Sequence, residues 1–342
     1  MPVVAASVYL AWKGYDVKWV CAVLALVGNV IFHAAGNLLS DWWDYRKGVD
    51  NEEAYAIPNL VFHHFEPRED LCFSALLFAA GICIGLLLTV LCGWKLLIIG
   101  IIGFALAASY SFFKFRAMGD IFVFTCFGVL PVIGTSFVAA GFIDWSILVL
   151  SVPLGIFTIA VLHDNNTVDI ATDKASGIHT LPMLLGERTS VKLYIAYMAV
   201  PYIAVIVFCI IGLLPFWALV CILSAPVAYK NASQAAGYFR VSGGADGSDL
   251  ADGACGAGSF GGAGSFDGAA CEASGIYGGS DGFCLADGTG GADVSGGRPV
   301  GGASDGRPVG REAMLGLDQK TAQLHLIFSV LLAAGLAVAA IF

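Results

Sequence analysis

Long apolar runs separated by polar stretches extend along almost the whole chain. Many of these runs approach 20 residues, the length that an α-helix needs to cross the hydrocarbon core of a bilayer. The pattern predicts an all-α, polytopic membrane protein with about nine transmembrane helices in a bundle. We expect the helices at residues 2–12 (short), 17–39, 71–92, 95–113, 121–141, 146–163, 192–213, 215–236 and 320–342.

The composition supports a membrane protein and argues against an ordinary soluble domain. Of the 342 residues, 58% are hydrophobic and only 13% are charged, with a mean hydropathy of +0.81. A soluble domain normally carries about a quarter charged residues. We therefore expect the chain to lie in a lipid bilayer and to have no nucleic-acid partner. The first apolar run lacks a basic region and a cleavage site, so we expect no cleaved signal peptide there.

The loops between the predicted helices alternate between short and long, and the basic residues follow that alternation. Of the 17 Lys and Arg, all but Lys13, Lys18 and Lys95 lie at long loops. Because loops rich in Lys and Arg stay on the cytoplasmic side, we expect the long loops to be cytoplasmic. A multi-pass protein of the bacterial inner or plasma membrane is the expected setting.

Residues 242–312 depart from the apolar pattern. They are rich in Gly, Ala and Asp, have no apolar periodicity and contain the repeated sequence Gly-Arg-Pro-Val-Gly at 297–301 and 306–310. Such a composition cannot bury enough apolar surface to offset its ordering entropy. The chain is thus expected to divide into residues 1–241 with eight helices, a disordered cytoplasmic insert at 242–312, and residues 313–342 with the last helix.

Two clusters of amides and carboxylates follow predicted helices on the long-loop side. The first is formed at i, i+4 and i+7 by Asn37, Asp41 and Asp44. The second is formed at i, i+4 and i+8 by Asn165, Asp169 and Asp173. Each spacing places its three residues on one face of a helix. The repetition favours an internal duplication in which each half contributes one acidic face.

Carboxylates at the edge of a membrane are costly unless they are paired or bind a cation. Mg²⁺ is a hard ion that takes carboxylate oxygens and keeps positions open for phosphate oxygens. Two facing clusters would therefore hold Mg²⁺ and, through it, a diphosphate. A single acidic cluster at a helix end is more often a solvated cap, but two matching clusters on the same side make that explanation weaker.

At these residues the chain resembles the UbiA superfamily of intramembrane aromatic prenyltransferases. The stretches that carry the likeness are residues 36–50, 115–124, 177–182 and 317–325. Within the superfamily, the likeness is greatest to the 1,4-dihydroxy-2-naphthoate polyprenyltransferases of menaquinone biosynthesis. Ser40 and Val168 depart from the pattern, since the resemblance leads us to expect Asn and Arg at these positions.

The resemblance implies roles for individual residues. Asp41, Asp44, Asp169 and Asp173 would be the metal ligands and bind Mg²⁺ and diphosphate. Asn37 and Asn165 would be catalytic polar residues one turn before them. The resemblance also suggests substrate-binding roles for several cations near the clusters and for one aromatic residue. These residues are Lys114, Arg116, Lys47, Lys174 and Tyr110. For Lys114 and Arg116, an equal alternative is that their positive charges only orient the protein in the membrane. For Tyr110, aromatic packing is an alternative to shielding a carbocation.

The expected activity is Mg²⁺-dependent transfer of a polyprenyl group from a polyprenyl diphosphate to an aromatic acceptor. The resemblance implies 1,4-dihydroxy-2-naphthoate as acceptor, with decarboxylation to a demethylmenaquinone. Alternatives are a related enzyme for 4-hydroxybenzoate, haem or a chlorophyllide, a secondary transporter, or a catalytically silent scaffold. A transporter would more often carry its charges in mid-span than at helix ends.

Overall fold

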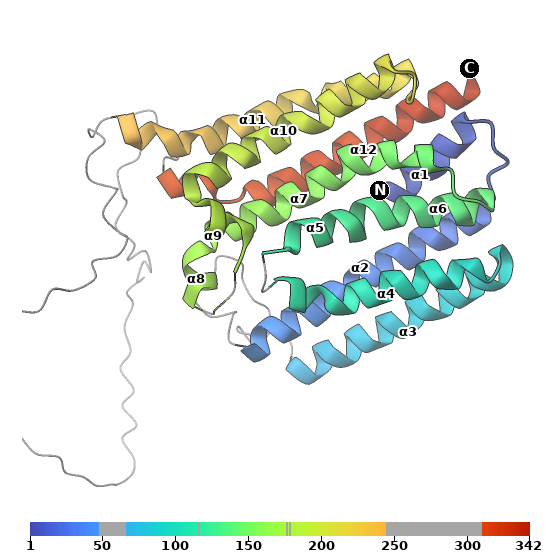
Figure 1. Cartoon of the computed structure of the whole chain (residues 1–342), viewed down its shortest axis with the longest axis horizontal. Helices are drawn as coiled ribbons and strands as arrows, with labels where there is room; N and C mark the ends of the chain where they lie inside the picture. The colour runs from blue at the N-terminus through green and yellow to red at the C-terminus, as the bar shows by residue number, and fades with distance from the viewer. Residues whose placement is uncertain (48–65, 115–116, 176, 178, 244–309) are drawn as a thin grey trace, which may run out of the picture.

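The computed structural model is an all-helical bundle in which long helices run roughly parallel or antiparallel to one another (Figure 1). It describes residues 1–47, 66–114, 117–175, 177, 179–243 and 310–342. The helices of the first half are α1 (Pro2–Trp12), α2 (Trp19–Lys47), α3 (Pro67–Cys92), α4 (Lys95–Lys114), α5 (Gly119–Val123), η1 (Phe124–Val129) and α6 (Leu130–Ala140). Those of the second half are η2 (Trp145–Leu150), α7 (Ser151–Val168), α8 (Ile170–Ala175), α9 (Leu181–Leu185), α10 (Glu187–Ile210), η3 (Phe216–Ser224), α11 (Ala225–Ala235), η4 (Ala236–Gly243), η5 (Gly310–Met314) and α12 (Leu317–Ile341).

Within the described residues, six helical segments are long and apolar enough to cross a membrane. They are Trp19–Trp43, Pro67–Cys92, Gly119–Ala140, Trp145–Val168, Glu187–Ile210 and Gly310–Ile341. Two shorter apolar helices, Pro2–Trp12 and Lys95–Leu106, accompany them. The all-α membrane fold is therefore confirmed, and every predicted span coincides with helix, but the total of nine membrane spans remains a prediction.

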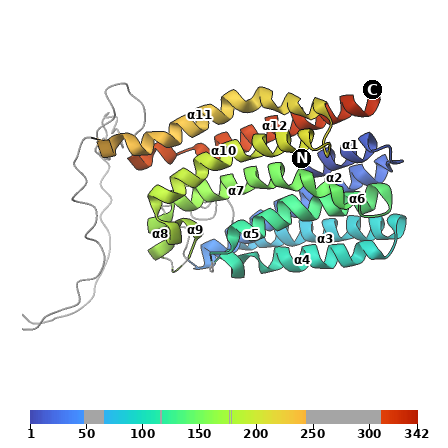
Figure 2. The ribbon, with the colours of Figure 1, turned by 45° about the horizontal axis from the view of Figure 1, so that its top comes forward.

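The central packing unit joins helices from both ends of the chain. In both ribbon views α12 lies beside α7 and α1 (Figures 1 and 2). Tyr9 and Leu10 of α1 are fully buried in the same core as Phe157 of α7 and Phe328 of α12. The rings of Phe157 and Phe328 lie 5.0 Å apart in an edge-to-face arrangement, which adds to the stabilisation from burial alone.

The outer helices α3 and α4 carry large apolar side chains that no other part of the described protein covers. Val90 of α3 is 82% exposed and Ile101 of α4 is 60% exposed. Such faces are unfavourable in water but suit the hydrocarbon of a bilayer, where the backbone polar groups are already satisfied within the helices. The exposed apolar surface thus supports the membrane assignment independently of helix length.

A π-helical segment interrupts the rod formed by α5, η1 and α6. One residue separates η1 from Pro131, which has no N–H with which to continue an α-helical hydrogen-bond ladder. Beside it, Gly128 lies so close to α7 that an added Cβ would come 3.1 Å from the Cα of Gly155. Small residues permit this close approach of two helices. The rod and α7 are thereby held close together at this contact.

Candidate functional site

The first aspartate motif lies on the last turns of α2, which continues well past the predicted end at residue 39 and stops at Lys47. Asn37 and Asp41 lie one turn apart on this helix, and both are exposed. The guanidinium of Arg46 lies 5.0 Å from the ring centroid of Trp42, a cation–π contact that steadies the end of the helix. The side chain of Asp44 lies outside the described residues.

The face of α2 that carries this motif is turned toward the π-helical segment. His33 precedes Asn37 by one turn and lies on the same face. Its ring lies 4.8 Å from the ring of Phe127 in η1. Since η1 also packs against α7, the motif face of α2 is directed toward the side of the bundle that contains the second motif.

The second motif spans the end of α7 and the short helix α8. We predicted one continuous helix through Asn165, Asp169 and Asp173, but α7 ends at Val168 and Asp169 takes the non-helical backbone angles φ −89° and ψ 11°. The one-turn spacing nevertheless persists, because Asp169 N donates to Asn165 O at 2.9 Å and Asp173 N donates to Asp169 O at 2.8 Å. Asp173 is buried, whereas Asn165 and Asp169 are partly exposed.

The predicted basic and aromatic residues lie on elements that end near these motifs. In both ribbon views, the ends of α2, α4 and α7 and the whole of α8 lie at the same end of the bundle (Figures 1 and 2). Lys174 is exposed on α8, Lys47 ends α2, and Lys114 ends α4. The side chains of Lys47, Tyr110 and Lys114 lie outside the described residues, as does Arg116 altogether. Their proposed substrate contacts remain predictions.

Carboxylates are suitable ligands for Mg²⁺, but a complete metal site is not formed by the side chains that the structure describes. In that part of the chain, no three His, Cys, Asp or Glu residues gather closely enough to hold a metal ion. Asp44, one of the four predicted ligands, is not among the side chains described. The donor chemistry therefore fits a hard divalent cation, while the convergence of the four aspartates stays a prediction.

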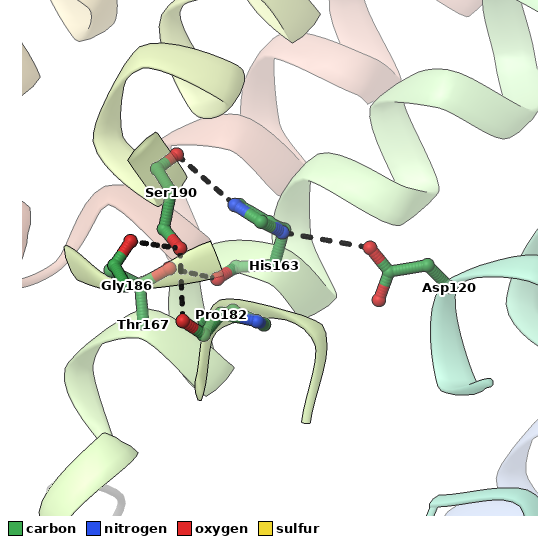
Figure 3. Close-up of polar contacts among 6 residues, drawn as sticks. All are labelled: Asp120, His163, Thr167, Pro182, Gly186 and Ser190. Carbon is green, nitrogen blue, oxygen red and sulfur yellow. Dashed lines mark hydrogen bonds and ion pairs between the residues drawn. The ribbon is translucent and has the colours of Figure 1, made fainter. Parts of the chain in front are cut away.

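A buried pair, Asp120 and His163, lies beside the second motif and was missed by the sequence analysis (Figure 3). Asp120 is in the first turn of α5 and is 7% exposed, and His163 of α7 is fully buried. Their Oδ2 and Nδ1 atoms are 3.5 Å apart. His163 Nε2 lies 3.1 Å from the carbonyl oxygen of Ser190 in α10. Three helices thus meet at one imidazole ring.

The end of α7 and the start of α10 are fixed by further hydrogen bonds around this ring. The Thr167 hydroxyl donates to the carbonyl oxygen of His163 at 2.6 Å. The Ser190 hydroxyl donates to the carbonyl oxygen of Gly186 at 3.0 Å (Figure 3). Because buried polar groups are costly unless satisfied, this network holds the backbone immediately before the second aspartate motif in one arrangement.

A small depression opens beside Asp120. It is only large enough for about one water molecule and is lined by Asp120, Leu162, Asn166 and Thr180 among others. One rim is formed by Ala117, whose backbone N–H donates to the carbonyl oxygen of His179 at 2.6 Å. Ala117 has a φ of 55°, which is unusual for a residue with a Cβ and often marks a functional site.

The sequence offered weak signals for these residues. Asp120 is the first acidic residue after the Lys114–Met118 loop, inside one of the stretches that carry the family resemblance. His163 and the buried Asp164 directly precede Asn165 and interrupt an otherwise apolar run. Single polar residues at helix ends are usually caps or satisfied core residues, so only the tertiary packing distinguishes this pair.

Comparison with animal proteins reveals clear relatives. The chain is 36% identical over 199 residues to "UbiA prenyltransferase domain-containing protein 1" of Danio rerio, covering 56% of this chain and 57% of that protein. It is 33% identical over 189 residues to the Homo sapiens protein of the same name, covering 54% of each. The chain thus matches little more than half the length of these curated relatives.

Two solved structures share the fold. A UbiA homologue from Aeropyrum pernix K1, solved in its apo form, superposes with a TM-score of 0.56 at 19% identity, covering 68% of this chain and 87% of that one. A digeranylgeranylglyceryl phosphate synthase superposes with a TM-score of 0.53 at 13% identity, covering 98% and 93%. At these identities the likeness extends to the fold alone.

The sequence model of one family covers most of the described helices. The UbiA prenyltransferase family model matches residues 1–237, which include both aspartate motifs, Asp120 and His163. The match supports the superfamily resemblance seen in the sequence, while the expected likeness to naphthoate prenyltransferases receives no separate support from these relatives. With this family model matched over its first 237 residues, the chain belongs to the UbiA prenyltransferase family.

Proposed function

We propose that the protein transfers a polyprenyl group from a polyprenyl diphosphate to an aromatic acceptor, using Mg²⁺ bound by the two aspartate motifs. The observation that carries the proposal is that both motifs lie at the same end of an apolar helical bundle in a member of this family. A lipid-soluble prenyl chain can enter from the bilayer, and its charged diphosphate can stay at the bundle end.

Different parts of this chain would have different roles in the proposed reaction. Asp41, Asp44, Asp169 and Asp173 would hold the cation and thereby orient the diphosphate. When bound, Mg²⁺ would stabilise the negative charge that develops on the leaving diphosphate. The bond between the allylic carbon and the diphosphate oxygen breaks, and the electron-rich ring of the acceptor forms a new bond to that carbon. The apolar bundle keeps water away from the reactive carbon until the ring has added.

The acceptor is proposed to be 1,4-dihydroxy-2-naphthoate, whose carboxylate leaves as CO₂ to give a demethylmenaquinone. The support is the sequence resemblance alone, since the names of the animal relatives specify no acceptor. Basic residues after the motifs, such as Lys174, would attract the anionic substrates to this end of the bundle. We further propose that this end faces the cytoplasm, because most Lys and Arg residues lie there.

A product assay tests the proposal. Purified protein in nanodiscs is incubated with Mg²⁺, a polyprenyl diphosphate and an acceptor panel that includes the naphthoate and 4-hydroxybenzoate, and products are identified by mass spectrometry. We expect a prenylated naphthalene product that disappears with EDTA and returns with Mg²⁺. Prenylation of 4-hydroxybenzoate alone would change the acceptor, and full turnover in EDTA would reject the metal.

Variants of single aspartates test the site. Asp41→Asn and Asp169→Asn should each lower kcat by roughly 100-fold or more, as expected when a group that stabilises transition-state charge is removed. Asp16→Asn is the matched control, because Asp16 is an exposed aspartate in the α1–α2 loop at the other end of the bundle. Unchanged turnover in Asp169→Asn would exclude the proposed role of the second motif.

A further inference from the structure

Two cysteines from neighbouring helices meet at the end of the bundle opposite the aspartate motifs. Cys21 lies two residues after the start of α2, and Cys92 is the last residue of α3. These two helices pack side by side in both ribbon views (Figures 1 and 2). The thiols of Cys21 and Cys92 are hydrogen-bonded to each other, and both side chains belong to one small apolar cluster. The two sulfur atoms therefore face each other across the contact between α2 and α3.

The surrounding residues hold the two thiols together. Cys21 is buried, whereas Cys92 is partly exposed at the end of its helix. The Cys92 thiol donates to the carbonyl oxygen of Val138 in α6 at 3.5 Å. Because each thiol has a single hydrogen, the hydrogen between the two sulfurs comes from Cys21. A disulfide requires two cysteines whose side chains point toward each other at close range, and this pair meets that requirement.

Tryptophan residues indicate that this end of the bundle lies at a membrane surface. Tryptophan is enriched where a bilayer meets water, because its ring is apolar and its N–H is polar. Trp19 of α2 is 53% exposed, and Trp94 between α3 and α4 is 68% exposed. Five of the seven tryptophans lie at this end, namely Trp12, Trp19, Trp94, Trp145 and Trp217. Cys21 and Cys92 are each two residues from such a tryptophan, so they lie close to the aqueous surface.

The basic residues indicate which aqueous compartment this is. Of the 17 Lys and Arg, only Lys13, Lys18 and Lys95 lie at loops of this end. A membrane end poor in Lys and Arg normally faces away from the cytoplasm. This orientation is part of the proposed function, on which the present inference rests. The compartments on that side, such as the periplasm, the cell exterior or the lumen of the endoplasmic reticulum, are oxidising and allow disulfides to persist.

We propose that Cys21 and Cys92 form a disulfide bond that joins the start of α2 to the end of α3. The oxidant is the disulfide of a thiol–disulfide oxidoreductase of that compartment. The Cys92 thiolate attacks this disulfide, forms a mixed disulfide and releases one thiol of the oxidoreductase. The Cys21 thiolate then attacks the Cys92 sulfur, and the second thiol of the oxidoreductase leaves.

The two electrons and two protons of the cysteines thus pass to the oxidoreductase, which ends as a dithiol. The bond forms while the helices assemble, before the apolar cluster covers Cys21. It closes a loop over residues 22–91 and fixes the end of α2 that is remote from Asp41.

Counting the thiols that are released by reduction tests the proposal. Membranes that contain the protein are dissolved in SDS with N-ethylmaleimide, which blocks every free thiol. The purified protein is then reduced and treated with maleimide-polyethylene glycol, and the added groups are counted by gel shift. The wild-type protein should take up two more groups than Cys21→Ser or Cys92→Ser. Cys72→Ser is the matched control and should resemble the wild type, because Cys72 is exposed near the other end of α3.

Mass spectrometry of a non-reduced digest identifies the bond without any variant. The expected species is one peptide pair linked through Cys21 and Cys92, which separates on reduction. A wild-type protein that takes up no groups after reduction would overturn the proposal. An uptake that is unchanged in both Cys21→Ser and Cys92→Ser would also overturn it, because the disulfide would then lie elsewhere.

The bond should also change thermal stability. A cross-link restricts the unfolded chain more than the folded one, so reduction should lower the Tm of the wild-type protein by roughly 5 °C or more. The double variant Cys21→Ser/Cys92→Ser should show no change in Tm on reduction. An equal decrease in both proteins would refute the stabilising bond.

Failure of this inference can be distinguished from failure of the proposed function. A protein that makes the prenylated product but contains no bond between Cys21 and Cys92 contradicts only the disulfide. A protein that contains the bond but makes no prenylated product contradicts only the proposed function.

Discussion

Gly335 of α12 lies directly against the backbone of Trp217 in η3, and a methyl group added to Gly335 would overlap the carbonyl oxygen of Trp217. Because the obstacle is backbone, it cannot move aside as a flexible side chain would. Gly335→Ala should therefore destabilise the protein by about 1–3 kcal/mol, the usual cost of overpacking a core, measured as a lower Tm in detergent. Gly100→Ala in α4 is the control, because its added Cβ meets nothing within 4 Å; equal Tm changes would contradict the packing argument.

The hydroxyl groups of Tyr194 in α10 and Thr321 in α12 form a buried hydrogen bond of 2.6 Å. Tyr194→Phe leaves the Thr321 hydroxyl without this partner and should cost about 1–3 kcal/mol of unfolding free energy. Adding Thr321→Val should restore part of that loss, since both polar groups are then absent. Chemical denaturation of the two single variants and the double variant measures the coupling. Additive losses would show that the two hydroxyls do not depend on each other.

Asp144 should make the stability of the protein depend on pH at the end of the bundle opposite the motifs. Burial alone would raise the pKa of Asp144, but hydrogen bonds from Ser146 and Tyr15 and the charge of Lys13 outweigh burial and lower it. The Tyr15 hydroxyl donates to Asp144 Oδ2 at 3.1 Å. A lowered pKa in the folded state stabilises the protein above the ordinary pKa of aspartate, and this contribution is lost as the pH falls through the lowered value.

The test measures how far Tm falls between about pH 5 and pH 2 in the wild-type protein and in Asp144→Asn. The variant should show a smaller loss of Tm over this range, because it has no carboxylate to protonate at this position. The difference should be modest, since Asp144 is partly exposed to solvent. Identical pH profiles for the two proteins would rule out the contribution of Asp144.

Residues 244–309 lie outside the described structure, but the elements on either side are fixed to each other. Arg311 of η5 pairs with Glu187 of α10, and the Tyr238 hydroxyl of η4 donates to Glu187 Oε2 at 3.0 Å. The amide of Gln234 donates to the carbonyl oxygens of Ala313 and Leu315, each at 3.1 Å. The elements on both sides of residues 244–309 are thus anchored near the start of α10.

Replacing residues 244–309 with a Gly/Ser linker of about ten residues, which can span up to about 33 Å, should leave Tm and prenyl transfer unchanged. The physical reason is that η4 and η5 are held to α10 and α11 by contacts among the described residues. The linker variant combined with Glu187→Ala should lose stability, because this substitution removes the carboxylate that binds both Arg311 and Tyr238. Loss of folding in the linker variant alone would contradict the view that 242–312 is an insert.

The positions of the helices could be predicted from the sequence, but their lengths could not. Hydropathy placed the end of the second helix at residue 39, whereas α2 continues to Lys47. The start of α10 was expected at residue 192 and is found at Glu187. Hydropathy measures the part of a helix that suits hydrocarbon, and these helices continue beyond it through polar residues. The aspartate motifs lie on or beside such extensions, where the predicted boundaries were least accurate.

The aspartate motifs were visible in the sequence because their members recur one turn apart. Asp120 and His163 were not, because they are far apart along the chain and become neighbours only when α5 packs against α7. The break at Asp169 was equally hidden, since the residues around it have ordinary helical spacing. Local periodicity identifies residues that share a helix face, whereas pairs between helices depend on how the helices pack.

The π-helical turns at Phe124–Val129 determine which way Asp120 faces. Each residue of an α-helix turns the chain by about 100°, and a π-helical turn accommodates an additional residue without breaking the rod. Excising a single residue from this segment would return the rod to regular α-helix and rotate everything N-terminal to it by roughly a quarter of a revolution. Asp120 would then point away from His163, while α6 kept its position. The direction of this carboxylate is therefore set by the additional residue in the π-helical segment, one to two turns further along the same rod.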